Sequence, residues 1–210
     1  MAGKILNSNV ERYLDHLLPK RDSVLSDMER YARKHDVPII GPACGRLLYL
    51  VAQMSGAKRI FEMGSAIGYS TIWLARAAGA GAEIYYTDGS PENAKRAKDN
   101  FQRAGVDDRI KILVGDAFAH FDASSGQFDL IFIDIDKHQY PEALEKALPR
   151  LKSGGILLTD NVLWSGRVTS KSKDVRTRAI QKFNQMLYAS KELFPILIPL
   201  RDGVAVCRKI

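Results

Sequence analysis

Short apolar runs alternate with longer amphipathic segments along most of this chain. The amphipathic segments have the hydrophobic spacing of helices and cover 69–78, 91–104 and 140–151. The apolar runs have the length of strands and cover 59–63, 83–87, 110–114, 128–134 and 155–159. Strands that alternate with helices are typical of βαβ units on a parallel sheet. The run at 128–134 is apolar on both faces, which predicts a sheet covered by helices on both sides.

Residues with strong turn and cap preferences support these boundaries. Ser90 is a typical helix N-cap, and Pro91 behind it suits the first helical position. Gly105 is the glycine expected just past a helix end. The Lys152-Ser153-Gly154-Gly155 stretch predicts a tight loop before the next strand.

The two ends of the chain have a different pattern of hydrophobic and polar residues. Residues from about 7 to 53 indicate helices only, and near the other end 174–189 is also helical. The last two apolar runs, 194–200 and 204–209, flank Arg201-Asp202-Gly203. Asp-Gly between two such runs predicts a β-hairpin. We therefore expect one α/β domain over residues 1–210, with N-terminal helices in 1–57, an α/β core in 58–210 and an antiparallel hairpin at the end.

Composition and length fit a single globular enzyme-sized domain. The chain has 210 residues, of which 46% are hydrophobic and 26% charged, and both fractions are ordinary for a soluble protein. No apolar run is long enough to span a bilayer, and the N-terminus lacks the apolar stretch of a signal peptide. These features predict a cytoplasmic protein. The two cysteines, Cys44 and Cys207, lack the spacing of a zinc ribbon and suit a reducing compartment.

The chain carries a net charge of +7. This charge allows an anionic partner without requiring one. Basic residues gather between Arg167 and Arg178, which favours an RNA substrate as an alternative function. No aromatic-studded RNA-binding motif accompanies them, so nucleic acid is possible but not favoured.

Candidate chemistry follows the ends of the predicted strands, where open α/β sheets bind their ligands. The first strand leads into Glu62-Met63-Gly64-Ser65-Ala66-Ile67-Gly68-Tyr69-Ser70. This segment is neither a dinucleotide fingerprint nor a P-loop, and by itself it is also compatible with a simple turn. Asp88 follows the second strand and is placed to accept hydrogen bonds from a ribose. Asp116 follows the third and could accept from an adenine amino group, so the three strand ends together favour a nucleoside site.

Oxygen ligands follow the fourth and fifth strands. Asp134, Asp160 and Asn161 supply three hard oxygen donors, the type that suits Mg²⁺. Without a cation, carboxylates crowded at neighbouring strand ends would repel one another. The alternative is that these side chains cap helices or pair with Lys137 and Arg167. None of the four histidines has a partner at metal-ligand spacing.

In this order the segments 62–70, Gly115-Asp116-Ala117, 132–137, 160–164 and Asp202-Gly203 resemble a known family. They are similar to the cation-dependent O-methyltransferases of the caffeoyl-CoA and catechol type, which are class I S-adenosylmethionine-dependent enzymes. The resemblance implies a Rossmann-like, mostly parallel seven-stranded sheet with helices on both faces and the last strand antiparallel. It also implies a homodimer.

The resemblance further implies a set of site residues. S-adenosylmethionine would lie across the Gly64–Gly68 loop, with Asp88 on the ribose and Asp116 near the adenine. Asp134, Asp160 and Asn161 match the family's ligands for a divalent cation, Mg²⁺ first, and Lys137 matches its catalytic lysine. The predicted cofactor-binding residues are Glu62, Gly64, Ser65, Gly68, Tyr69, Ser70, Asp88, Asp116, Ala117 and Asp134.

The predicted reaction is methyl transfer to a metal-bound hydroxyl of a small catechol-like or phenolic acceptor. Two adjacent hydroxyls could chelate the cation, which favours catechols. Lys137 could take the proton or stabilise the oxyanion; alternatively it forms only a structural ion pair with Asp136 or Asp160. Arg201 stands where plant members of the family usually have glycine, and the plant substrate-binding insertion is not evident. A caffeoyl-CoA substrate is therefore not implied, and a non-catalytic nucleotide-binding protein is disfavoured by the intact set around Asp134.

Overall fold

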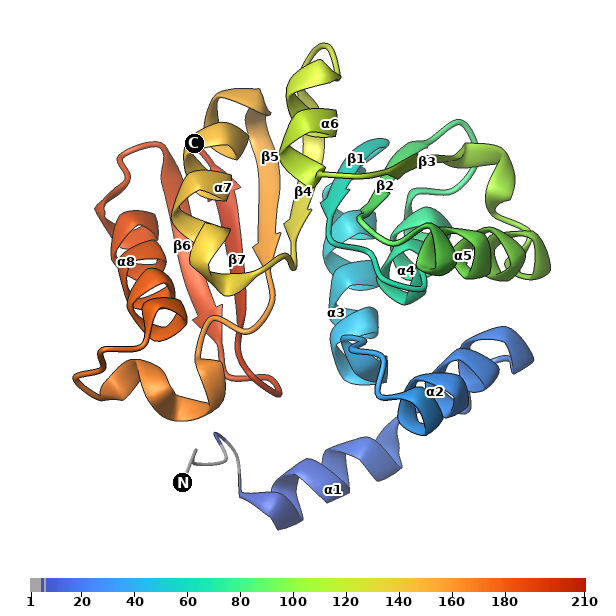
Figure 1. Cartoon of the computed structure of the whole chain (residues 1–210), viewed down its shortest axis with the longest axis horizontal. Coiled ribbons are helices and arrows are strands. Elements are labelled where there is room, and N and C mark those ends of the chain that lie inside the picture. Colours follow the sequence, from blue (N-terminus) through green and yellow to red (C-terminus); the bar gives the residue numbers. More distant parts are fainter. Residues whose placement is uncertain (1–4, 6) are drawn as a thin grey trace. The chain divides into compact units, whose positions relative to one another are not determined.

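A computed structural model describes residues 5 and 7–210, so residues 1–4 and 6 of the predicted N-terminal segment lie outside the described part. The chain divides into two compact units. The first unit is Leu18–Ser125, and the second is Gly126–Ile210 together with the N-terminal helix α1 (Ser8–Leu17). Figure 1 shows the elements of both units in sequence colours.

The first unit contains two helices followed by three β–α repeats. Its strands are β1 (Arg59–Met63), β2 (Glu83–Asp88) and β3 (Ile110–Val114), parallel and in the order β3-β2-β1. Its helices are α2 (Ser23–His35), α3 (Gly41–Met54), α4 (Tyr69–Ala78), α5 (Pro91–Ala104), the 3₁₀ turn η1 (Asp107–Arg109) and α6 (Ala117–Ala123).

Aromatic residues on β2 show how both faces of this sheet are covered. Successive side chains of a strand point to opposite faces. Tyr85 stacks on Phe61 of β1, which makes an edge contact with Phe121 of α6. Tyr86 instead contacts Phe101 of α5. Helices α5 and α6 therefore cover opposite faces, as the apolar strands predicted.

The second unit carries the remaining strands. They are β4 (Phe128–Ile133), β5 (Leu151–Thr159), β6 (Leu193–Ile198) and β7 (Val204–Lys209), in the order β4-β5-β7-β6. Strands β4 and β5 are parallel, whereas β7 runs antiparallel to both β5 and β6. The other elements are the 3₁₀ turns η2 (Lys137–Gln139) and η3 (Trp164–Thr169) and the helices α7 (Tyr140–Arg150) and α8 (Val175–Ala189).

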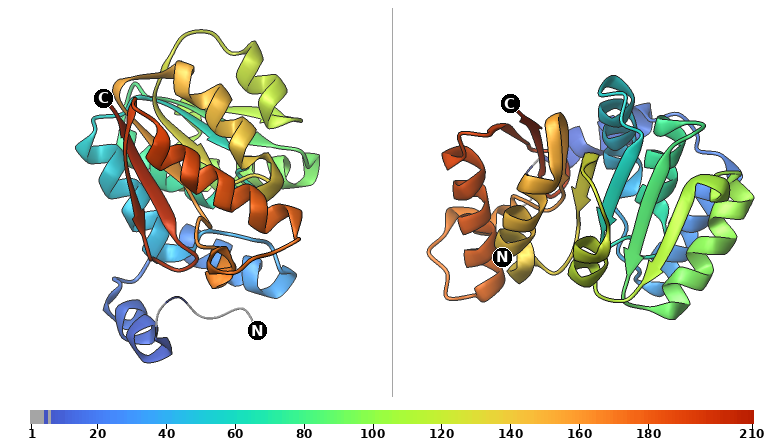
Figure 2. Two further views of the ribbon diagram at one scale, coloured as in Figure 1. Left: turned by 90° about the vertical axis from the view of Figure 1, so that its left-hand side faces the viewer. Right: turned by 90° about the horizontal axis from the view of Figure 1, so that it is seen from above.

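Helices α7 and α8 lie side by side on the second unit's strands (Figures 1 and 2). Their contact includes Tyr140 and Phe183, both buried, with ring centroids 5.3 Å apart. The end of β4, the turn η2 and the start of α7 follow one another directly, so this packing fixes the residues after β4. That position holds several of the predicted site residues.

Most predicted elements are confirmed within two or three residues. Ser90 caps α5 by accepting a hydrogen bond from the Asn93 amide, and Gly105 ends that helix in the left-handed conformation. Strands β6 and β7 form the predicted hairpin. The helix α6 (Ala117–Ala123) was not predicted from the sequence, because its seven residues give less than two full periods of hydrophobic spacing.

The prediction of a loop at Lys152–Gly155 is wrong. These residues belong to β5 as an irregular stretch, because Leu151 pairs with Phe128 whereas Ile156 pairs with Leu130. A Cβ atom at Gly155 would lie 2.8 Å from the Lys152 carbonyl oxygen, so this bulge requires glycine. The two glycines thus mark a bulge inside a strand rather than a loop before one.

Two further observations concern the whole described chain. None of its described helices is long and apolar enough to cross a membrane. Cys44 in α3 and Cys207 in β7 are fully buried and do not form a disulfide. Burial raises the pKa of the Cys207 thiol to about 12.

Candidate active site

The loop between β1 and α4 has a backbone that only certain residues can adopt. Gly64, Ala66 and Gly68 all have positive φ angles, of 82°, 45° and 85°. A Cβ atom at Gly68 would lie 2.4 Å from the Phe101 ring. The loop therefore needs glycine at position 68 for both backbone and space.

Side chains from neighbouring elements hold this loop in place. The Tyr86 hydroxyl donates to the Ala66 carbonyl at 2.5 Å, and the Asn100 amide donates to the Ile67 carbonyl at 3.1 Å. The Asp88 carboxylate accepts from the Ala66 amide at 3.0 Å. The loop is thus already ordered, which lowers the entropy cost of binding a ligand across it.

Asp88 lies at the end of β2, as predicted, and its carboxylate is partly used by the protein. Besides the Ala66 amide it accepts from the Ser90 amide at 2.8 Å and from the Asn93 side chain at 3.0 Å. A carboxylate can accept about four hydrogen bonds. Three are therefore occupied, which leaves capacity for about one ribose hydroxyl.

The other predicted cofactor residues of the first unit fall into two groups. Four are buried, in β1, in the loop or at the start of α4: Glu62, Ser65, Tyr69 and Ser70. The Tyr69 hydroxyl donates to Glu29 at 2.8 Å, and burial, followed by this hydrogen bond, raises the pKa of Tyr69 well above its usual value. Asp116 is exposed and caps α6 by accepting from the Ala119 amide at 2.8 Å, with Ala117 directly behind it.

In the second unit, Lys137 is held by three acceptors. Its Nζ donates to Asp134 Oδ1 at 2.8 Å, to the Ile135 carbonyl at 3.2 Å and to the Tyr140 hydroxyl at 2.8 Å. The ion pair is therefore with Asp134, and not with Asp136 or Asp160 as the structural alternative expected. Asp134 therefore forms the ion pair with Lys137 that the sequence analysis gave as an alternative to metal binding.

Tyr140 links Lys137 to the next strand end. Its buried hydroxyl donates to the Asp160 backbone carbonyl at 2.9 Å. Burial, followed by the negative charges of Asp134 and Asp160, raises the pKa of Tyr140 well above its usual value. The tyrosine thus stays a neutral donor and fixes the distance between the lysine and the end of β5.

Asp160 is a buried carboxylate that the protein compensates only in part. Its side chain is 4% exposed, and its Oδ1 has no hydrogen-bond partner among the described residues. Its Oδ2 lies 3.8 Å from Arg201 Nη1. Burial, followed by the charge of Asp134, raises the pKa of Asp160 well above its ordinary range. A divalent cation beside it would favour the ionised form.

Asn161 follows Asp160 with a φ of 60°. Asparagine tolerates this left-handed backbone better than other non-glycine residues. The next residues continue in a tight turn, in which the Trp164 amide donates to the Asn161 carbonyl at 3.2 Å. The conformation therefore gives a local reason for asparagine here, beside any role as a ligand.

The donor set after β4 and β5 fits a hard cation. Asp134, Asp160 and Asn161 offer only oxygen donors, and one of those oxygens is buried without a partner. No cluster of three His, Cys, Asp or Glu side chains suited to a metal is present in the described part of the chain.

Similarity to known proteins identifies the family. The family model for O-methyltransferases matches residues 19–210. The chain belongs to the O-methyltransferase family. A catechol O-methyltransferase of Niastella koreensis is 33% identical over 98% of this chain and 98% of its own length.

Solved O-methyltransferase structures extend this likeness to the fold. The enzyme of Bacillus cereus in complex with SAH has a TM-score of 0.87 and 29% identity over 96% of this chain and 97% of its own. TomG of Streptomyces achromogenes, in complex with SAM, also gives 0.87 and 29%, over 96% of both chains. The expected class I methyltransferase fold, mostly parallel and seven-stranded with a C-terminal antiparallel hairpin, is thereby confirmed.

Two residues of this O-methyltransferase around the candidate site were not identified from the sequence. Tyr140 gives no sequence signal, because a tyrosine at the start of an amphipathic helix is an ordinary core residue. Arg201 was noted only as a departure from plant members, and its approach to Asp160 depends on the hairpin geometry. The comparisons give no support to the RNA alternative.

Proposed function

We propose that this O-methyltransferase transfers the methyl group of S-adenosylmethionine to a hydroxyl of a small catechol-like or phenolic acceptor, with a divalent cation, Mg²⁺ first, at Asp134, Asp160 and Asn161. The observation that carries the proposal is the buried Asp160 carboxylate, with one oxygen unpartnered among the described residues and Asp134 close enough to raise its pKa. The name of the Niastella relative supports catechols as acceptors.

The first unit supplies the cofactor residues in this proposal. The ordered Gly64–Gly68 loop and Asp88 would hold the nucleoside, with Asp88 accepting from one ribose hydroxyl. Asp116 and Ala117 would lie at the adenine. Glu62, Ser65, Tyr69 and Ser70 would act through the shape of the loop, since all four are buried.

The second unit supplies the acceptor chemistry. A bound divalent cation would lower the pKa of a coordinated hydroxyl and orient its oxygen. Lys137 Nζ, held by Asp134 and Tyr140, would donate to the developing oxyanion as an ammonium. It would take the hydroxyl proton only as the neutral amine, which a divalent cation nearby would favour. Methyl transfer from a sulfonium is an in-line displacement, so alignment of oxygen and methyl contributes much of the rate.

The test is metal dependence with a matched control. Exhaustive chelation should abolish transfer to catechol, and Mg²⁺ or Mn²⁺ should restore it. Asp160→Ala should lose transfer while still binding S-adenosylmethionine in calorimetry. Asp136→Ala is the control, because Asp136 is an exposed acid two residues past Asp134. Full activity after chelation would overturn the cation assignment.

Assembly and location are further parts of the proposal. We propose a cytoplasmic homodimer with no membrane association. An apolar face on α1 supports self-association, since Val10, Tyr13, Leu14 and Leu17 are between 41% and 64% exposed. Analytical ultracentrifugation of the wild type and of Tyr13→Glu would test the dimer and this face together.

A further inference from the structure

The positive charge of this protein is concentrated in one segment. Residues 161–190 contain six basic and one acidic residue, a net charge of +5 out of +7 for the whole chain. The other 180 residues carry 25 basic and 23 acidic residues and are close to neutral. The segment comprises the turn η3, the following loop and α8, directly after the proposed metal ligand Asn161.

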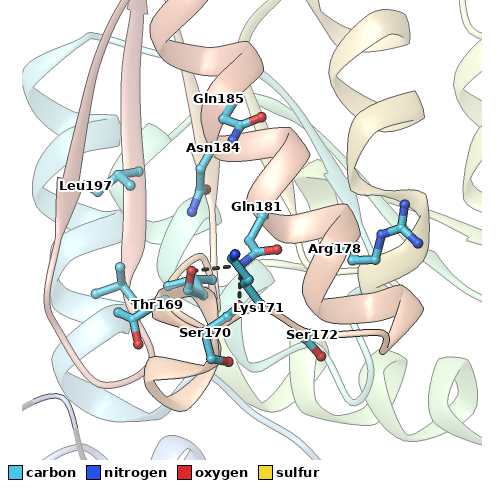
Figure 3. A pocket seen from close by; sticks show the side chains of 11 residues that line it. Thr169, Ser170, Lys171, Ser172, Arg178, Gln181, Asn184, Gln185 and Leu197 are labelled. Atoms are coloured by element: carbon cyan, nitrogen blue, oxygen red, sulfur yellow. Dashed lines mark hydrogen bonds between the residues drawn. The ribbon is translucent and has the colours of Figure 1, made fainter.

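An open hollow of about 640 Å³ lies within this segment. It is bounded by the 168–172 stretch, by α8 and by Leu197 of β6. Figure 3 shows Arg178, Gln181, Asn184 and Gln185 following one another along α8, with Leu197 on the opposite side from Arg178. The volume is in the range of small-molecule sites.

The walls of the hollow are held by hydrogen bonds to the backbone. Gln181 Nε2 donates to the carbonyls of Val168 and Ser170, at 2.9 Å each (Figure 3). The Thr169 hydroxyl donates to the Gly166 carbonyl at 2.8 Å, and the Ser170 hydroxyl to the Arg167 carbonyl at 2.9 Å. Gln181 thus fixes the loop onto α8, whereas the two hydroxyls hold the turn η3 itself.

Two cations line the hollow, and one of them, Arg178, also lines a second hollow that contains Glu142 and Glu145. Of the six basic residues in the segment, only Lys171 and Arg178 belong to its lining. Neither forms an ion pair with any residue that the structure describes. Asn184 also lines it, and the Asn184 Oδ1 atom is buried with no hydrogen-bond partner among those residues.

The hollow begins next to the proposed metal ligands. Leu163, two residues after Asn161, is part of its lining. The Asn184 amide donates to the Val162 carbonyl at 2.8 Å and so ties the hollow to the same turn. A substituent on an acceptor held at Asn161 could therefore extend into the hollow.

We propose that this hollow is an anion subsite for the acceptor, which takes a carboxylate substituent of a catechol ring. Lys171 is its main charge partner, and Arg178 stands at the rim. A single small anion matches a lining with Lys171 as its main cation, whereas nucleic acid needs a longer series of phosphate contacts. The subsite rests on the proposed function and narrows the acceptor class to anionic catechols.

The experiment compares two acceptors of similar size, of which 3,4-dihydroxybenzoate is an anion and 4-methylcatechol is neutral. The measured quantity is the ratio of their kcat/KM values. Lys171→Gln should lower this ratio about fivefold, the upper end for an exposed charge pair, because Lys171 is exposed. Arg178→Gln should lower it about twofold, because Arg178 is exposed as well and also lines a second hollow. Lys173→Gln is the matched control, because Lys173 does not line the hollow, and it should leave the ratio unchanged.

Binding is measured separately from turnover. Calorimetric affinity for 3,4-dihydroxybenzoate should fall in Lys171→Gln and stay constant in Lys173→Gln, and rising KCl should weaken it. This affinity measurement tests the subsite even if neither acceptor is methylated. A lack of methylation alone would overturn the proposed function and not the subsite. If Lys171→Gln and Lys173→Gln lost affinity equally, for 3,4-dihydroxybenzoate or for tRNA, the subsite would be overturned. Anions would then bind to a diffuse basic surface instead.

Discussion

Replacement of Gly203 by alanine tests how the terminal hairpin supports the candidate site. Gly203 has a φ of 86°, and a Cβ atom there would lie 2.4 Å from Leu163 Cγ. The Gly203 carbonyl accepts from the Val162 amide at 3.0 Å, and the Asp202 carbonyl accepts from the Leu163 amide at 2.9 Å. The turn therefore holds the segment that follows Asn161.

The expected loss of stability has two components. An alanine at positive φ costs about 1 kcal/mol or somewhat more, and forcing a methyl group into occupied space costs about 1–3 kcal/mol. Gly203→Ala should thus lower the free energy of unfolding by about 2–4 kcal/mol. For a chain of this length, that corresponds to a decrease in Tm of about 5–15 °C.

Gly56 separates the two components. Its φ is 64°, but a Cβ atom there would meet no atom within 4 Å. Gly56→Ala should therefore show the backbone cost alone, about 1 kcal/mol. The variants would be compared by urea and thermal denaturation, together with Mg²⁺ affinity by calorimetry, which should fall only for Gly203→Ala.

A double-mutant cycle identifies the clash. Leu163→Ala removes the Cγ and Cδ1 contacts while it keeps the Cβ contact at 2.8 Å. In that background the Gly203→Ala penalty should shrink by about 1 kcal/mol or more, within the range for residues in contact. Equal losses in Gly203→Ala and Gly56→Ala would refute the argument from close packing.

Three further predictions concern single side chains. Asp88→Ala should weaken S-adenosylmethionine binding by about 1.5–3 kcal/mol in calorimetry, the value of a charged hydrogen bond; unchanged affinity would remove Asp88 from the ribose role. Lys137→Ala should slow single-turnover methyl transfer about 10²–10⁴-fold, more for a catechol of high pKa than for a nitrocatechol, and a wild-type rate across this series would leave only a structural role. Lys111, followed by Arg59, lowers the pKa of Glu83 to about 2. The ionised Glu83 therefore contributes its full share to the free energy of unfolding above about pH 4.5, and this contribution is lost as the pH falls toward 2. Glu83→Gln should consequently be less stable than wild type at pH 7, by about 1 kcal/mol or less because the pair is partly exposed, and pH-dependent denaturation should show the difference vanishing in that acid range.

The regular parts of the fold could be predicted because their signals are local. Tyr69–Ala78 and Pro91–Ala104 have helical spacing and good caps, and the strand at Ile110–Val114 is a compact apolar run. The bulge at Lys152–Gly155 was not predictable, because glycine marks loops and bulges equally. Only the register of β5 against β4 distinguishes the two.

For the candidate site, too, only local features could be predicted. Asp88, Asp134 and Asp160 could be chosen as candidate site residues because the order of the sequence places them at strand ends. The contacts of Asp160 could not: the Tyr140–Asp160 hydrogen bond and the approach of Arg201 to Asp160 join residues 20 and 41 positions apart. Such contacts arise only once α7 and the hairpin are packed.

The two buried cysteines can be used to measure local unfolding in each unit of the chain. Cys44 lies in the first unit and Cys207 in the second, and both have 0% exposure. A thiol reagent can therefore modify each one only when the surrounding unit opens, and the rate of modification measures the free energy of that opening. Mass spectrometry of the two cysteine-containing peptides would follow both units in one experiment. Ligands of the nucleoside loop should slow labelling at Cys44, and divalent cations should slow it at Cys207.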